Sequence, residues 1–95
     1  MGVITNTAKD VMQNDGVRTI FVRTESGDSA DTTTVDLSDY GCSEIAGILG
    51  FVENTSGSVV VQEQPTTSVS SSTLTITVGG STVTGKVRNY FVYAR

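Results

Sequence analysis

Short runs of β-branched residues recur along this sequence, separated by turn-forming Gly, Asn, Asp and Ser. Val, Ile and Thr make up 34 of the 95 residues, whereas Leu occurs three times and Ala four times. Side chains branched at Cβ pack well on a pleated sheet, so this composition favours strands over helices. The chain is short enough for one core, and turn signals about every 8 to 12 residues predict a small single-domain antiparallel β-sandwich or barrel.

Five segments carry the clearest strand pattern, in which β-branched or aromatic residues dominate. These predicted strands span residues 17–24, 32–37, 58–64, 73–78 and 87–94. In the first of them, Arg18 and Arg23 fall on opposite faces. This placement predicts that strand 17–24 lies at an edge of the sheet or in an interface.

Segment 43–54 is open between strand and helix. Gly47 and Gly50 disfavour a helix, because each Gly in a helix interior costs about 1 kcal/mol relative to Ala. In a strand, two-residue alternation would place Ile45, Leu49 and Phe51 on one face.

Gly79-Gly80 follows the strictly alternating stretch TLTITV at 73–78. Two consecutive glycines can supply the positive φ angles of a type I′ turn, which predicts a two-residue hairpin with residues 81–87 returning antiparallel. In that register Val83 lies opposite Ile76 and Gly85 opposite Leu74. We expect loops at 25–31 and 65–72, and a turn or one 3₁₀ turn at 38–41.

The two ends of the chain differ in pattern. Residues 1–16 are weakly periodic and are interpreted as an N-terminal arm, with a short helical turn around 8–13, ahead of a β domain at 17–95. The last strand is apolar on both faces, with Phe91 and Tyr93 on one and Tyr90 and Val92 on the other. Such a strand is either central in the sheet or at a subunit contact. Core packing is the expectation for Phe91.

Composition excludes several functions. The chain has no His and no Trp, which rules out His-based catalysis and His metal ligation. Cys42 has no intrachain partner, so we expect a reduced, buried thiol rather than a disulfide. The net charge of −4 disfavours nucleic-acid binding. The most apolar stretch, residues 45–52, is far shorter than the roughly 20 residues of a membrane-spanning helix, and no targeting segment is evident.

The acidic residues and hydroxyls give no recognisable catalytic pattern. Four aspartates fall within twelve residues but lack calcium-loop spacing, and we interpret them as solvated loop acids: Asp28, Asp31, Asp36 and Asp39. Two acid pairs are candidates for sugar hydrolysis but are not favoured: Asp36 with Glu44, and Glu53 with Glu63. Lys9 and Lys86 lie in no Ser-x-x-Lys setting that would activate a hydroxyl. Asn54-Thr55-Ser56 is interpreted as a turn. We predict no catalytic, cofactor-binding or metal-binding residues.

Two segments carry a family resemblance, VDLSDYGCSEIAGILGF at 35–51 and TLTITVGGSTVTGKVRNYFVYAR at 73–95. Together with the Ser/Thr/Val/Gly-rich composition, they resemble virion structural proteins of tailed bacteriophages, most of all capsid decoration (cement) proteins. The resemblance lies in residue composition and in the order of the segments along the chain.

The resemblance implies a non-enzymatic subunit that is made in the host cytoplasm and stabilises an icosahedral shell, often as a trimer. Its partner would be the major capsid protein or another virion protein, with no nucleic acid and no membrane. On this basis we expect interface residues in the arm and last strand: Val3, Ile4, Val11, Met12, Tyr90, Tyr93 and Arg95. The alternatives are a tail-tube, head–tail joining or fibre-associated protein, a carbohydrate-binding module using Tyr40, Tyr90 or Tyr93, and a small enzyme.

Overall fold

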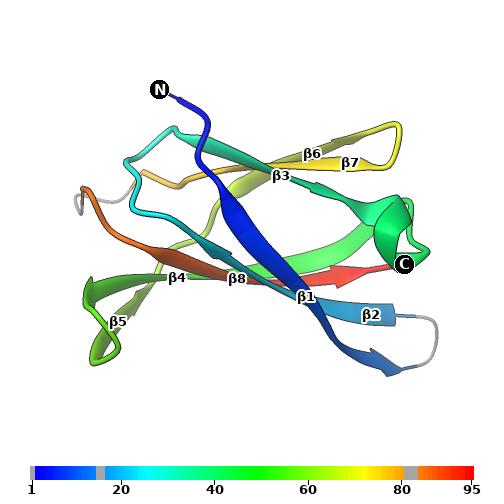
Figure 1. Cartoon of the computed structure of the whole chain (residues 1–95), viewed down its shortest axis with the longest axis horizontal. Helices are drawn as coiled ribbons and strands as arrows, with labels where there is room; N and C mark the ends of the chain where they lie inside the picture. Colours follow the sequence, from blue (N-terminus) through cyan, green and yellow to red (C-terminus); the bar gives the residue numbers. More distant parts are fainter. Residues whose placement is uncertain (1, 15–16, 81–83) are drawn as a thin grey trace.

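Two antiparallel β-sheets lie face to face as a sandwich in the computed structural model of this chain (Figure 1). The structure describes residues 2–14, 17–80 and 84–95, with the backbone alone at 11–14. The described elements are β1 (Asn6–Asn14), β2 (Val17–Thr24), β3 (Thr32–Asp36), the 3₁₀ helix η1 (Leu37–Tyr40), β4 (Ile45–Thr55), β5 (Val59–Gln62), β6 (Thr66–Ser70), β7 (Thr73–Thr77) and β8 (Arg88–Ala94). The larger sheet has the order β1-β2-β8-β4-β5 and the smaller the order β3-β7-β6. The predicted all-β class is confirmed, and the architecture is a sandwich.

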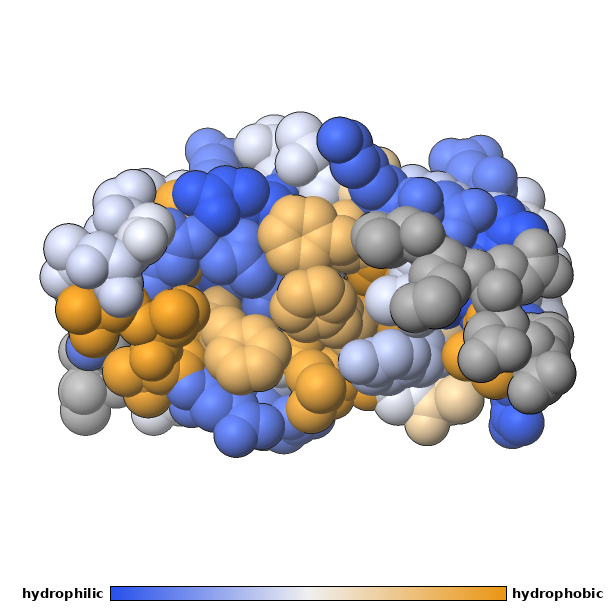
Figure 2. All heavy atoms as spheres, turned by 90° about the horizontal axis from the view of Figure 1, so that it is seen from below, coloured by the Kyte–Doolittle hydropathy of each residue, from blue (hydrophilic) through white to orange (hydrophobic). Residues whose placement is uncertain are grey.

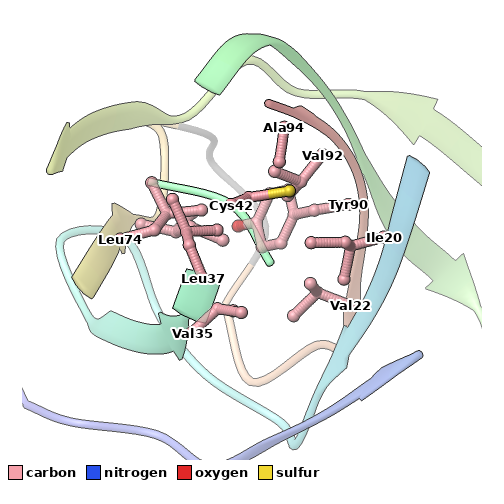
Figure 3. Packing of buried hydrophobic residues seen from close by; sticks show 10 residues of the cluster. Ile20, Val22, Val35, Leu37, Cys42, Leu74, Tyr90, Val92 and Ala94 are labelled. Carbon is pink, nitrogen blue, oxygen red and sulfur yellow. The ribbon is translucent and has the colours of Figure 1, made fainter. Parts of the chain in front are cut away.

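Apolar side chains from both sheets meet between the layers. Ile20 and Val22 of β2 and Val92 of β8 face Leu74 of β7 (Figure 3). Ile76 of β7 belongs to the same cluster, and all five side chains are fully buried. Within β2 and within β7 these residues are two positions apart, because successive side chains of a strand point to opposite faces. The core is therefore built by the alternation that the sequence displays.

The five predicted strands all form, each within two residues of its expected ends. The last of them, β8, lies between β2 and β4, which confirms a central position. Strand 17–24 was expected at an edge or in an interface; the edge position is wrong, because β1 pairs with the outer side of β2. Its two arginines keep partial exposure to solvent and form ion pairs with residues of other strands, Arg18 with Asp10 and Arg23 with Glu53.

Residues 6–14 form a strand and not the expected helical turn. β1 pairs antiparallel with β2 from Asn6↔Thr24 to Asn14↔Val17, with a register shift between Asp10 and Met12. Residue 14 pairs with residue 17, and positions 15 and 16 lie outside the described residues. Pairing with β2 satisfies the backbone groups of this segment, which local sequence periodicity does not reveal.

Segment 43–54 is a strand, which settles the open choice at this position. The expectation that Ile45 shares a face with Leu49 and Phe51 is wrong. A register shift between Ile45 and Gly47 places Ile45 opposite Ala94, where it packs against the core, whereas Leu49 lies opposite Phe91 on the other face. An extra residue in one strand reverses the alternation beyond it.

The predicted Gly79-Gly80 hairpin is wrong, and the hairpin lies one strand earlier. β7 already pairs with β3 on one side and β6 on the other, so Ile76 lies opposite Thr33 and Thr67, and Leu74 opposite Val35 and Val69. No edge of β7 remains for residues 81–87, of which 81–83 lie outside the described part.

The expected loop at 65–72 contains β6, which joins β7 through Ser71 and Ser72 at φ angles of 50° and 63°. Gly79 instead allows a close approach, because a Cβ there would lie 2.6 Å from the carbonyl oxygen of Gln64. Of the turn or 3₁₀ turn expected at 38–41, the structure has the 3₁₀ form, η1 (Leu37–Tyr40), and the expected loop at 25–31 is confirmed.

Candidate functional site

The structure distributes the seven predicted interface residues over several places. Val3 is exposed next to Thr32, whereas Ile4 is buried against Gly27. Val11 and Met12 lie in β1 at its register shift, and Arg95 is exposed and paired with Glu44 at 2.7 Å. Tyr90 is fully buried in the core and offers no surface to a partner, while Tyr93 is half-buried on the opposite side of β8. These residues do not form one continuous patch.

A different group gathers on the outer face of the larger sheet. Phe21 of β2 lies directly opposite Phe91 of β8, and Phe51 of β4 is the next aromatic neighbour. The ring centroids are 5.3 Å apart for Phe21–Phe91 and 6.2 Å apart for Phe51–Phe91. Figure 2 shows apolar side chains gathered over the middle of this face. We call Phe21, Phe51 and Phe91 the phenylalanine face.

The expected core position of Phe91 is therefore wrong. The inner face of β8 is filled by Tyr90, Val92 and Ala94, so the alternate residues must point outward. Phe21 and Phe51 were not predicted as surface residues. For Phe21 the signal was present in strand 17–24, where it lies between the core residues Ile20 and Val22.

A polar network borders the phenylalanine face. The carboxylate of Glu53 accepts hydrogen bonds from Asn89 Nδ2 at 2.7 Å, from Arg23 and from the backbone N–H of Gly57 at 3.2 Å. These donors, Asn89 first and then Arg23, lower the pKa of Glu53 from 4.5 to about 2. Together with Phe21, Phe51, Phe91 and Val60, residues Arg23 and Asn89 line a shallow hollow. The face thus combines an apolar centre with a fixed, charged rim.

A second ion pair is buried between the sheets. Arg88 Nε donates to Glu63 Oε1 at 3.1 Å, and its Nη1 donates to the carbonyl oxygens of Gly27 and Lys86. Both side chains are almost wholly inaccessible to solvent. Burial, with the negative charge of Glu63 as the next cause, raises the pKa of Tyr90 to about 12. This cluster is closed to solvent and serves the fold.

Six of the seven acids considered for metal binding or sugar hydrolysis hold backbone or ion-pair partners. Asp31 accepts from the backbone N–H groups of Gly2 and Asp28, and the Asp28 contact is the largest cause that lowers its pKa. Asp28 accepts from the N–H of Gly85 at 2.6 Å, and Asp36 caps η1 through Ser38. Glu53 and Glu63 take part in the two separate networks described above. Within the described ranges, no three potential ligands come together to hold a metal ion.

Cys42 lies in the core cluster with its Sγ 3.5 Å from the carbonyl oxygen of Tyr40, so the prediction of a small buried residue is confirmed (Figure 3). In the part of the chain that the structure covers, no helix is long and apolar enough to cross a membrane.

Comparisons with protein-family models, with curated proteins and with solved structures find no match.

Proposed function

We propose that this chain is a non-enzymatic structural protein of a tailed-phage virion, a decoration subunit that binds and stabilises the capsid shell. The proposal includes self-association, with a trimer favoured, and the major capsid protein as partner. The subunit would be made in the host cytoplasm. The family resemblance of segments 35–51 and 73–95 supports this assignment.

The phenylalanine face is the observation that carries the proposal. Three aromatic rings are held by three neighbouring strands of one sheet, so docking would order few additional side chains. Aromatic residues are enriched in protein interfaces, and burial of apolar area contributes about 25 cal/mol per Å². Repetition of a modest contact over a symmetric shell sums to a large stabilisation of the lattice.

The carboxylates that already bind arginines or backbone N–H groups support a binding role over an enzymatic one. Glu53 and Glu63 are held by arginines on different strands, Arg23 of β2 and Arg88 of β8. Asp31 and Asp36 bind backbone N–H groups of their own loops. A group fixed in this way stabilises the fold and is not poised for proton transfer to a substrate.

A carbohydrate-binding module is the second candidate, because three half-buried aromatic side chains lie together on one outer face. Sugar rings stack best on flat aromatic surfaces, yet the Phe21 and Phe91 rings are inclined by 47° and the Phe51 and Phe91 rings by 79°. This arrangement suits an irregular protein surface better than a flat sugar ring. A glycan array separates the two candidates: specific glycan binding would favour the module.

Sedimentation of a native lysate from the source through a density gradient tests the virion role, with peptide mass spectrometry of each fraction. Comigration with a shell protein in near-equal copy number is expected for a decoration subunit. Comigration in few copies would indicate a tail-tube, joining or fibre-associated protein instead. A chain that stays at the top of the gradient would overturn the proposal.

A further inference from the structure

The edge strand β5 exposes valines on both of its faces. β5 ends the larger sheet, and Val59, Val60 and Val61 are 48%, 56% and 44% exposed. Among the described residues, they are three of the five large hydrophobic residues that are exposed. Figure 1 shows β5 at the lower left, at the free edge of the larger sheet.

The register with β4 defines which way each valine points. Val60 lies opposite Glu53 and therefore on the side of the phenylalanine face, where it lines the same hollow. Val61 lies opposite the buried Val52, on the side of the smaller sheet. The smaller sheet has only three strands against five, and it leaves Val61 accessible.

The backbone of β5 is also available for pairing. Glu63 N–H donates to Gly50 O on the β4 side. Because donors and acceptors alternate along an antiparallel strand, the N–H and C=O groups of Val60 and Gln62 point away from β4. Folded proteins commonly protect such edges with charges, proline or a covering segment. Residues 58–62 carry no charge and no proline.

The other edges differ from β5. β1 carries Lys9 and Asp10, and its Asn6 side chain donates to Thr33 and Thr34 of β3. In the smaller sheet, β6 is uncharged but most of its residues bear hydroxyl groups, and the other edge, β3, has three threonines and ends in Asp36. An apolar, uncharged edge is therefore particular to β5 among the described strands.

We propose that β5 pairs antiparallel with β5 of a second copy of this chain. Each copy carries a net charge of −4, so repulsion between two copies is weakest where the surfaces in contact are uncharged, and β5 has no charged residue. Antiparallel pairing about a two-fold axis normal to the sheet keeps equivalent faces on the same side. The two phenylalanine faces would then join through Val60, and the Val61 side chains would fill the gap between the two smaller sheets.

This contact joins copies in pairs about a two-fold axis, so the trimer named under the proposed function would need a separate contact. It goes beyond the virion role and does not depend on it. A dimer that does not sediment with particles would support the pairing and count against the virion proposal.

Sedimentation equilibrium of the purified full chain over a range of concentrations tests the pairing. We expect a reversible dimer, and Val60→Lys should raise its dissociation constant by about 100-fold or more, because each interface loses two valines and gains two like charges. The matched control is Ser68→Lys, at the middle of the exposed edge β6, which should leave the dimer unchanged. Circular dichroism and urea unfolding establish that both variants fold.

Hydrogen exchange of the unmodified chain gives a second readout that needs no variant. The amides of Val60 and Gln62 should gain protection as the concentration rises, because they lie at the new strand pair. A monomer at all concentrations, or an oligomer that Val60→Lys leaves intact, would overturn the proposal.

Discussion

At the scale of single residues, the buried Arg88–Glu63 pair places the greatest demand on the fold. Removal of two charges from water costs several kcal/mol for each ion unless hydrogen bonds replace the lost solvation. Here the Arg88 side chain binds Glu63 and two backbone carbonyl oxygens, and its backbone N–H donates to Thr24 Oγ1 at 3.0 Å. The pair joins the start of β8 to the segment after β5, which are 25 residues apart.

Glu63→Ala should destabilise the protein by about 3–5 kcal/mol, because it removes the carboxylate that offsets a buried guanidinium. The measurement is the free energy of unfolding in urea. Glu44→Ala is the matched control, since Glu44 pairs with Arg95 at the surface, and it should change the midpoint little. A loss below about 1 kcal/mol in Glu63→Ala would show that the pair is not structurally important.

The Glu53 network should make stability depend on acid pH. The pKa of Glu53 in the folded state, about 2, lies below its ordinary value of 4.5. The contribution of Glu53 to the free energy of unfolding is therefore fully present above pH 4.5 and is lost as the pH falls toward 2. Glu53→Gln should flatten the decrease in melting temperature over this window. If the wild-type and variant profiles run parallel between pH 4.5 and 2, the network does not contribute.

Sequence reasoning assigned most residues to the correct face but did not identify the ion-pair partners. Alternation correctly separated Phe91 and Tyr93 from Tyr90 and Val92. It did not pair Glu53 with Arg23 or Glu63 with Arg88, because these contacts span 30 and 25 residues and depend on the order of strands in the sheet. The phenylalanine face was missed for the same reason: its three members come from strands that become neighbours only in the folded sheet.

At the scale of elements, β4 contains two glycines with different roles. A Cβ at Gly50 would lie 2.3 Å from the backbone oxygen of Glu63 and 2.9 Å from the Tyr90 ring. At Gly47 the nearest atom, in the Tyr93 ring, would be 3.9 Å away, which is ordinary contact. Of these two positions, only Gly50 is closely approached by the segment that follows β5.

Gly50→Ala should lower the free energy of unfolding by about 1–3 kcal/mol, because a backbone carbonyl cannot move as a side chain can. Gly47→Ala, on the same strand, should leave stability unchanged or raise it slightly, since alanine restricts the unfolded chain. Thermal and urea unfolding of both variants provide the comparison. Equal effects of the two substitutions would contradict the close approach at Gly50.

Substitutions in the turn of the β6–β7 hairpin can raise the stability of the fold. Ser71 and Ser72 adopt φ angles of 50° and 63°, which Asn and Gly accept with less strain. The double substitution Ser71→Asn with Ser72→Gly should raise the free energy of unfolding by about 1 kcal/mol. Ser68→Gly, inside β6, should lower it instead. A double variant no more stable than wild type would contradict the assigned turn.

The turn also shows why element order was only partly predictable. Gly79-Gly80 carries the stronger local signal, but the chain uses Ser71-Ser72 for the hairpin because both sides of β7 are occupied by β3 and β6. Likewise, β1 has little periodicity of its own and is held by pairing with β2. Local propensity identified the strands with alternating apolar residues, and tertiary pairing determined the others.

At the scale of the whole molecule, the two sheets are unequal, with five strands against three. The smaller sheet can cover only part of the inner face of the larger one, and nothing in the described chain covers the phenylalanine face. On the outer side of the smaller sheet, Thr34 presents a hydroxyl, whereas the outward Phe91 of β8 presents an aromatic ring. The sandwich is thus polar on one outer side and aromatic on the other.

If the phenylalanine face docks on the shell, Phe91→Thr should weaken particle binding by about tenfold to 100-fold, because central aromatic residues dominate interface energetics. Thr is favoured in strands, so the variant should still fold, which circular dichroism checks. Thr34→Ala, on the outer face of the smaller sheet, is the matched control and should bind like wild type. The measurement is occupancy of purified particles after sedimentation with each variant. Equal occupancy for Phe91→Thr and Thr34→Ala would mean that the shell is bound by another surface.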